Sequence, residues 1–144
     1  MIEPEVLYSL SVPLHVVLPR KRVEDKKVKV TLNQYHNWHP HLRNEIKQVF
    51  TENIERPLMD SGLVPLTKIR KIKYTLWLDA NRTKEDTPNV TYLIDKYFCD
   101  ALVHYGYIPD DNWHTVITYE HTCGGVDRRN PRVEIQIYGY PRDK

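Results

Sequence analysis

One helix, predicted over residues 88–105, constrains the fold of this chain more than any other segment. Thr87 fits the N-cap, Pro88 fits the first helical position, where its missing N–H costs nothing, and Gly106 fits the left-handed residue after the last turn. Apolar residues recur at helical spacing on one broad face: Val90, Leu93, Ile94, Tyr97, Phe98, Ala101, Leu102 and Tyr105. The segment is therefore expected to pack as a long amphipathic helix on the rest of the chain.

Carboxylates lie on both sides of this helix. Two acids precede it and two follow Gly106: Glu85 and Asp86, then Asp110 and Asp111. One stripe beside the apolar face carries three polar residues: Asn89, Lys96 and Asp100. Asp95 lies on the opposite flank and is left out of the site. Because Mg²⁺ binds a few carboxylate oxygens and keeps several waters, the acids around this helix favour a magnesium site.

These motifs resemble the RusA-type Holliday-junction resolvases found in phages and prophages. That family has an Asp-x-Asp-Asn motif entering a helix, a lysine on the helix, an Asp-Ala-Leu and a Gly-containing turn that ends in Asp-Asp. The matching positions are Asp86, Asn89, Lys96, Asp100-Ala101-Leu102, Gly106, Asp110 and Asp111. There are two departures: Pro88 stands where the second aspartate is expected, and Asn89 lies about four residues, or one helical turn, further from Lys96.

The resemblance implies a homodimeric endonuclease that resolves branched DNA. Asp86, Asp110 and Asp111 would hold Mg²⁺, for which Mn²⁺ can substitute, and the catalytic residues would be Asp86, Lys96 and Asp111. Asn89, Asp100 and Glu85 would support this site. Because Pro88 removes a carboxylate, two alternatives stay open: a branched-DNA-binding protein that has lost catalysis, and a phage protein that uses the fold to bind a host protein.

Length and composition predict one domain over residues 1–144. A chain of this length with 40% hydrophobic residues can bury a substantial core. No apolar run has transmembrane length, and the N-terminus shows no signal-peptide pattern. Cys99 and Cys123 lack metal-ligand spacing, as expected of reduced thiols, so a cytoplasmic location in a bacterial host is expected. The chain has no Gly-rich phosphate loop, and no nucleotide cofactor is expected.

Periodicity predicts five strands and a second helix. The expected strands cover residues 6–16, 27–32, 69–78, 115–122 and 132–138, with the last two joined as a loose hairpin through Gly124 and Gly125. The second helix begins at Pro40 and ends near Pro57. The order β-β-α-β-α-β-β predicts an α+β fold with two helices on a mixed five-stranded sheet. This order also resembles the RusA-type fold.

Basic clusters and one aromatic loop are the expected DNA contacts. The basic residues are Arg20, Lys21, Arg22, Lys71, Lys73, Arg128 and Arg129, which would neutralise backbone phosphates. In the loop, Asn33, Tyr35 and Trp38 would contact substrate, and the two aromatic rings could stack on unpaired bases. Two alternatives remain: Trp38 covers the core, or the nearby histidines bind zinc.

Overall fold

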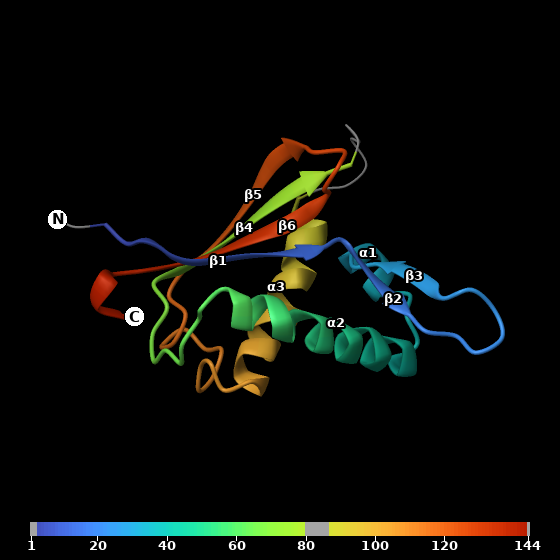
Figure 1. The fold of residues 1–144 in the computed structure, drawn as a ribbon, viewed down its shortest axis with the longest axis horizontal. Helices are drawn as coiled ribbons and strands as arrows, with labels where there is room; N and C mark the ends of the chain where they lie inside the picture. Colours follow the sequence, from blue (N-terminus) through green and yellow to red (C-terminus); the bar gives the residue numbers. More distant parts are fainter. Residues whose placement is uncertain (1–2, 80–86, 144) are drawn as a thin grey trace.

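A four-stranded mixed sheet forms the centre of the fold, and two long helices cover one of its faces (Figure 1). The computed structural model describes residues 3–79 and 87–143. Its strands are β1 (Glu5–Pro13), β2 (His15–Leu18), β3 (Lys26–Lys29), β4 (Lys71–Leu78), β5 (Tyr119–Val126) and β6 (Arg132–Gly139). Its helices are α1 (Leu32–Tyr35), α2 (Pro40–Asp60), α3 (Thr87–His104) and a terminal 3₁₀ turn, η1 (Pro141–Asp143). The α+β class predicted from the sequence is confirmed.

The strand order in the main sheet is β1-β6-β4-β5. The central strand β6 runs antiparallel to β1 and to β4, whereas β5 runs parallel to β4. Parallel neighbours need a crossover connection, and α3 supplies it between β4 and β5. The helix that carries part of the predicted site therefore packs against the sheet. Two adjacent residues of α3 face different elements: Asp95 bonds to Tyr74 on β4, and Lys96 bonds to Tyr35 on α1.

The predicted helix of residues 88–105 is confirmed as α3, within one residue at each end. Seven of its eight predicted apolar positions are buried, and Tyr105 packs against the core while partly exposed. Gly106 has a φ of +79°, its N–H donates to Val103 O at 3.1 Å, and the Tyr107 N–H donates to Leu102 O at 2.8 Å. These two bonds close the helix with the left-handed glycine that the sequence predicted.

Two predictions about the strands are wrong: the number of strands in the sheet and the hairpin between the last two strands. The sheet has four strands, not five, because the long first strand breaks after Pro13 and β2 pairs only with β3 in a separate two-stranded sheet. The last two strands do not form a hairpin: Gly124 and Gly125 lie inside β5, which pairs with β4 alone among the described strands. A two-residue-period pattern cannot identify the partner of a strand, so the sequence could not show that β4 separates β5 from β6.

The helices also extend further than predicted. α2 continues through Pro57 to Asp60, because Leu58 in its last turn is fully buried in the core. The predicted aromatic loop with Asn33, Tyr35 and Trp38 includes the short helix α1, whose N-cap Thr31 accepts a hydrogen bond from the Gln34 N–H at 3.3 Å. Among the described helices, none is long and apolar enough to cross a membrane.

Candidate functional site

Lys96 forms a polar cluster with α1 and α2. Its Nζ donates a hydrogen bond to Tyr35 Oη at 3.1 Å and lies 4.9 Å from the Tyr35 ring centroid. The Arg43 guanidinium lies 4.4 Å from the same centroid, and its Nε donates to the Tyr35 carbonyl at 3.1 Å. The hydrogen bond from Lys96 lowers the pKa of Tyr35, because it stabilises the phenolate. Tyr35 thus holds two cations next to each other.

A hydrogen bond between backbone and side chain docks α1 on α3. The Asn33 N–H donates to Asn89 Oδ1 at 2.9 Å, across 56 residues of sequence. This contact places Tyr35 beside Lys96, two turns further along α3 from Asn89. The structure therefore brings together four residues that the sequence assigned to the site from two separate segments: Asn33, Tyr35, Asn89 and Lys96.

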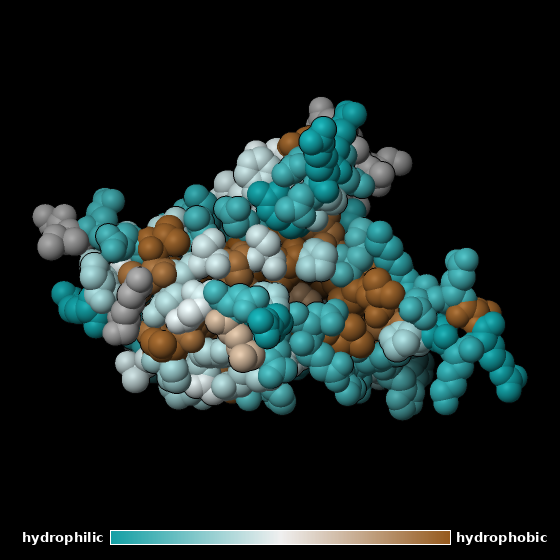
Figure 2. Space-filling model, in the orientation of Figure 1, coloured by the Kyte–Doolittle hydropathy of each residue, from teal (hydrophilic) through white to brown (hydrophobic). Residues whose placement is uncertain are grey.

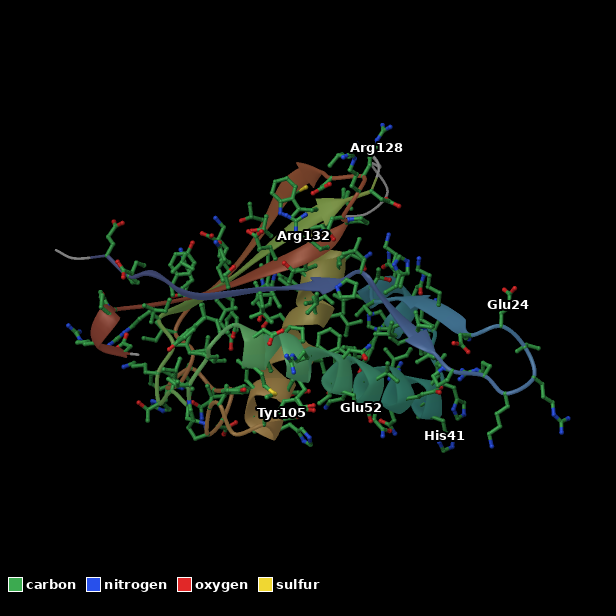
Figure 3. All side chains as sticks on the ribbon, in the orientation of Figure 1. Glu24, His41, Glu52, Tyr105, Arg128 and Arg132 are labelled. Atoms are coloured by element: carbon green, nitrogen blue, oxygen red, sulfur yellow. The ribbon has the colours of Figure 1, made fainter. Side chains whose placement is uncertain are left out.

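Two neighbouring cavities with different charge lie along α2 and α3. The first, of about 300 Å³, is lined by three cationic side chains, Arg43, Lys47 and Lys96, and its described lining includes no carboxylate. The second, of about 600 Å³, is lined by four acidic side chains: Glu52, Asp100, Asp110 and Asp111. Asn44 and Lys47 line both cavities. We call them the cationic cavity and the acidic cavity; the labelled side chains of Glu52 and Tyr105 in Figure 3 mark the acidic one.

Lys47 joins the two cavities through an ion pair. Its Nζ lies 2.8 Å from Asp100 Oδ2, with both side chains partly exposed. Asp100 therefore pairs with Lys47 on α2, whereas the helical spacing alone would also have allowed it to pair with Lys96. The result is a continuous polar strip from Lys96 to the turn that follows α3.

Asp110 and Asp111 lie in that turn, and they differ in their hydrogen bonds. Asp110 accepts from the Asp111 N–H at 2.8 Å and from Asn112 Nδ2 at 3.3 Å, so its carboxylate stabilises the turn. The exposed carboxylate of Asp111 makes no hydrogen bond or ion pair to any described side chain. Asp111 is therefore the acid of this turn that is available to an external ligand.

In sequence, the acidic residues predicted for the site before α3 precede its first residue, whereas this turn follows its last. Glu85 and Asp86 lie outside the described residues. The first residue of α3 is Thr87, and a helix of 18 residues is roughly 27 Å long. Within residues 3–79 and 87–143, no three His, Cys, Asp or Glu side chains are grouped so that they could hold a metal ion, which also covers the zinc alternative for His36, His39 and His41.

The other polar face of α3 is a largely buried cluster around Asp95, in which the Asp95 side chain is 18% exposed. Tyr74 Oη donates to Asp95 Oδ1 at 2.6 Å, and Cys99 Sγ donates to the same oxygen at 3.2 Å. His121 Nε2 lies 3.6 Å from Asp95 Oδ2, and its Nδ1 lies 2.8 Å from Thr91 Oγ1. Burial raises the pKa of Asp95 and lowers that of His121. This cluster joins α3 to β4 and β5.

This cluster was not predicted, although part of its signal was present in the sequence. Tyr74 lies between Ile72 and Leu76 in the inward-facing row of β4, and Asp95 follows a buried isoleucine on α3. A polar group in an inward row needs a partner. The positions of Tyr74 and Asp95 could therefore have predicted a pair, whereas His121 could not be added without knowing that β5 lies beside β4.

The remaining predicted DNA contacts fall into two groups: basic side chains that are paired with a carboxylate, and basic side chains that are exposed in loops. Arg20 pairs with Glu45 at 2.9 Å, and Lys71 and Lys73 both lie within 4 Å of Glu120. Four are exposed in loops: Lys21 and Arg22 between β2 and β3, and Arg128 and Arg129 between β5 and β6. Figure 2 shows hydrophilic side chains near the β2–β3 loop and near the β5–β6 loop, with apolar side chains between these two parts of the surface. Trp38 is only 9% exposed, as expected of a core residue.

Comparison of the sequence with models of known protein families finds no match, and comparison with curated proteins finds none at a significant level. The inference of function therefore depends on the residues of the site and on the motif resemblance.

Proposed function

We propose that this protein is a Mg²⁺-dependent endonuclease that acts on branched DNA. The cationic cavity beside the acidic cavity is the observation that carries this proposal. A phosphodiester needs cations around its oxygens, and hydrolysis needs an acid-bound metal close to them. Here Arg43, Lys47 and Lys96 supply the first, and the turn with Asp111 supplies carboxylates next to it.

The residues of the cationic cavity would bind and orient the phosphate. Lys96 has three N–H donors and gives one to Tyr35, so two remain for phosphate oxygens. Arg43 is fixed by its Nε bond to the Tyr35 carbonyl, which leaves the terminal guanidinium nitrogens for a second contact. Tyr35 acts as a positioning residue, because it sets the separation of these two cations before substrate arrives.

The acidic cavity fits a hydrated magnesium ion in part. Mg²⁺ is commonly held by one or two carboxylates and several waters, and Asp111 offers a free carboxylate at the border of a 600 Å³ cavity. Asp111, with Asp110 beside it, would hold the ion. When bound, the ion would supply an activated water and would neutralise charge at the phosphate. Asp86 stays a predicted metal ligand, but it precedes α3 in sequence, and a helix of roughly 27 Å separates the start of α3 from the turn with Asp111, so it is not proposed as a ligand of this ion.

A homodimer is part of this proposal. A four-way junction has approximate two-fold symmetry, and an isologous dimer presents two identical sites related by the same symmetry. Two copies of the strip formed by the cationic and acidic cavities would then face two equivalent strands.

A second candidate function is binding of branched DNA without cleavage. Two observations favour it: Pro88 stands where the resemblance expects a metal-binding aspartate, and Asp100 is already paired with Lys47. Under this proposal the cationic cavity keeps its role, and the acidic cavity is only a border of the binding surface.

One experiment separates the two functions. Synthetic four-way junctions are incubated with the protein in Mg²⁺ or Mn²⁺, with and without EDTA, and with Asp111→Asn or the matched surface variant Asp60→Asn. We expect cleavage that EDTA and Asp111→Asn abolish and Asp60→Asn preserves. Junction affinity of Asp111→Asn should be equal or higher, because a negative charge is removed.

Tight junction binding without metal-dependent cleavage by the wild type would favour the second candidate function. A protein that binds neither junctions nor duplex would overturn both.

A further inference from the structure

A third cavity, of about 260 Å³, lies between β3 and the start of α2. Its walls include Lys26 and Lys27 from β3, Gln34 and Asn37 from α1 and the turn after it, and Trp38 and Leu42. The proposed cleavage site does not use this cavity. Its volume is slightly below that of the smallest typical small-molecule pockets, about 300 Å³, so the occupant has to be small.

The charged groups of this cavity are free to bind an anion. Lys26 and Lys27 are exposed, and neither ammonium group has a carboxylate partner among the described residues. The described lining of the cavity includes no acidic side chain. Arg20, in the same hairpin, is instead neutralised by Glu45. At the border of the cavity itself, the anion-binding capacity therefore lies in Lys26 and Lys27.

The carboxamides supply directional hydrogen bonds. The Gln34 side chain is exposed and makes no hydrogen bond to a described residue. The hydrogen bond between Gln34 and the Thr31 side chain is donated by the backbone N–H of Gln34. Asn37 donates from Nδ2 to the Asn33 carbonyl at 3.2 Å, which fixes the orientation of its amide. Amide side chains pair with base edges through one donor and one acceptor. Val28 and Leu42 add apolar surface for a flat ring.

The third cavity lies near the cationic cavity, and this position favours a nucleotide as its occupant. Tyr35 lines the cationic cavity and Trp38 lines this one, and their rings contact edge to face with centroids 6.0 Å apart. The two cavities thus border the two rings of one aromatic pair. A strand whose phosphate occupies the cationic cavity can place a neighbouring nucleotide in the third cavity.

We infer that this cavity binds one unpaired nucleotide of the DNA substrate, with the base between Gln34, Asn37 and the apolar wall and its phosphate near Lys26 and Lys27. This inference rests on the proposed function and names the feature of the substrate that would be recognised: an unpaired base at the branch. A base that is stacked and paired in a duplex cannot enter the cavity and cannot offer its Watson–Crick edge to the amides, so the cavity would distinguish branched from fully paired DNA.

The test uses three labelled probes and fluorescence anisotropy. The probes are a paired duplex, the same duplex with one bulged nucleotide, and that bulge without its base. The protein variants are Gln34→Ala, which breaks no bond of α1, the double variant Gln34→Ala/Asn37→Ala, and the matched control Asn53→Ala, an exposed amide on α2 that lies outside all three cavities.

We expect the wild type to bind the bulged base about tenfold more tightly than the bulge without a base. The double variant should lose most of this preference, Gln34→Ala part of it, and Asn53→Ala none, while affinity for the paired duplex stays unchanged in all of them. Equal affinity of the wild type for the two bulges, or an undiminished preference in the double variant, would overturn the inference and leave the proposed function standing.

Two further outcomes are informative. Failure of the wild type to bind any of the three probes, while it binds four-way junctions, would overturn this inference and leave the proposed function standing; failure to bind junctions as well would overturn both. An acidic peptide that binds the wild type and not the double variant, with no effect of the bulged base, would overturn the nucleotide and identify the occupant as a protein segment.

Discussion

Asp95 and Lys96 are neighbours in sequence, and they belong to two opposite kinds of polar region. The cluster around Asp95 is buried between α3 and two strands, and its hydrogen bonds are made to Tyr74 and Cys99. The cluster around Lys96 is exposed, and three cationic side chains line a cavity there. One helix thus separates a closed polar network from an open one by a rotation of about 100°.

The difference shows how burial decides what a polar group does. A buried carboxylate must find its partners within the fold, because an unpaired buried polar group costs free energy. An exposed ammonium group is solvated and can keep donors for a ligand. The two clusters therefore predict opposite responses to substitution: the first should change stability, and the second should change binding.

The largest effect is expected for Asp95→Ala. The change leaves the Tyr74 hydroxyl and the Cys99 thiol without their common acceptor, and a buried unsatisfied donor costs about 1–3 kcal/mol. Removal of the buried carboxylate, whose raised pKa shows the cost of burying its charge, offsets part of this loss. We expect the free energy of unfolding to fall by roughly 2 kcal/mol, measured by urea denaturation.

DNA affinity provides the contrast for this variant. At temperatures at which Asp95→Ala stays folded, its affinity for duplex DNA should equal that of the wild type. A stable variant with weakened DNA binding would contradict the separation of the two faces.

Lys96→Met is the converse experiment. The side chain is exposed, so stability should change by less than about 0.5 kcal/mol. DNA affinity should fall about tenfold, and the slope of log affinity against log salt should flatten by roughly 0.9, because one phosphate contact is lost. Lys68→Met, an exposed lysine outside both cavities, is the matched control. An unchanged salt slope would show that Lys96 contacts no phosphate.

The same contrast explains what the sequence could predict. The helix, its apolar face and its glycine end were predictable because they depend on residues close in sequence. The stripe of Asn89, Lys96 and Asp100 followed from helical spacing, and in the structure α1 contacts Asn89 and Lys96, which was not predicted. The pairing of Asp100 with Lys47, however, depends on how α2 lies against α3, and periodicity contains no such information.

The basic clusters illustrate a second limit. A count of lysines and arginines predicts where charge is high, but the ion pairs decide which charges are free. Lys71 and Lys73 lie on one strand and share Glu120 on the neighbouring strand β5. Because the sequence did not reveal that β5 pairs with β4, it could not show that these two charges are partly neutralised.

A smaller effect is expected for Tyr35→Phe. The ring stays between Arg43 and Lys96, but the hydroxyl that accepts from Lys96 Nζ is removed. Loss of one exposed hydrogen bond should lower DNA affinity by about threefold. The pKa of Tyr35 in the wild type lies below its ordinary value of 10.0, because of Lys96, so Lys96→Met should raise it. Ring-carbon NMR titration measures this shift, and an unshifted titration in Lys96→Met would contradict the contact.

The smallest effect concerns the pH dependence of the buried cluster. Burial lowers the pKa of His121 below its ordinary value of 6.5, although the Asp95 carboxylate 3.6 Å away acts in the opposite direction. As pH falls below 6.5, the unfolded chain takes up the proton before the folded one does, so stability should decrease and then level off below the folded pKa.

The tyrosines and the cysteine of the cluster do not titrate in this window. Burial raises the pKa of Tyr74, Cys99 and Tyr119, so these side chains stay neutral near pH 6. The raised pKa of Asp95 has the opposite effect on the pH dependence of stability. The free energy of unfolding should fall as pH rises through 3.8, because the unfolded chain loses that proton first. Urea denaturation between pH 5 and 8 should show stability rising with pH in the wild type and in the exposed control His41→Gln, and a flat profile in His121→Gln. A slope that persists in His121→Gln would mean that the pH dependence arises outside the buried face of α3.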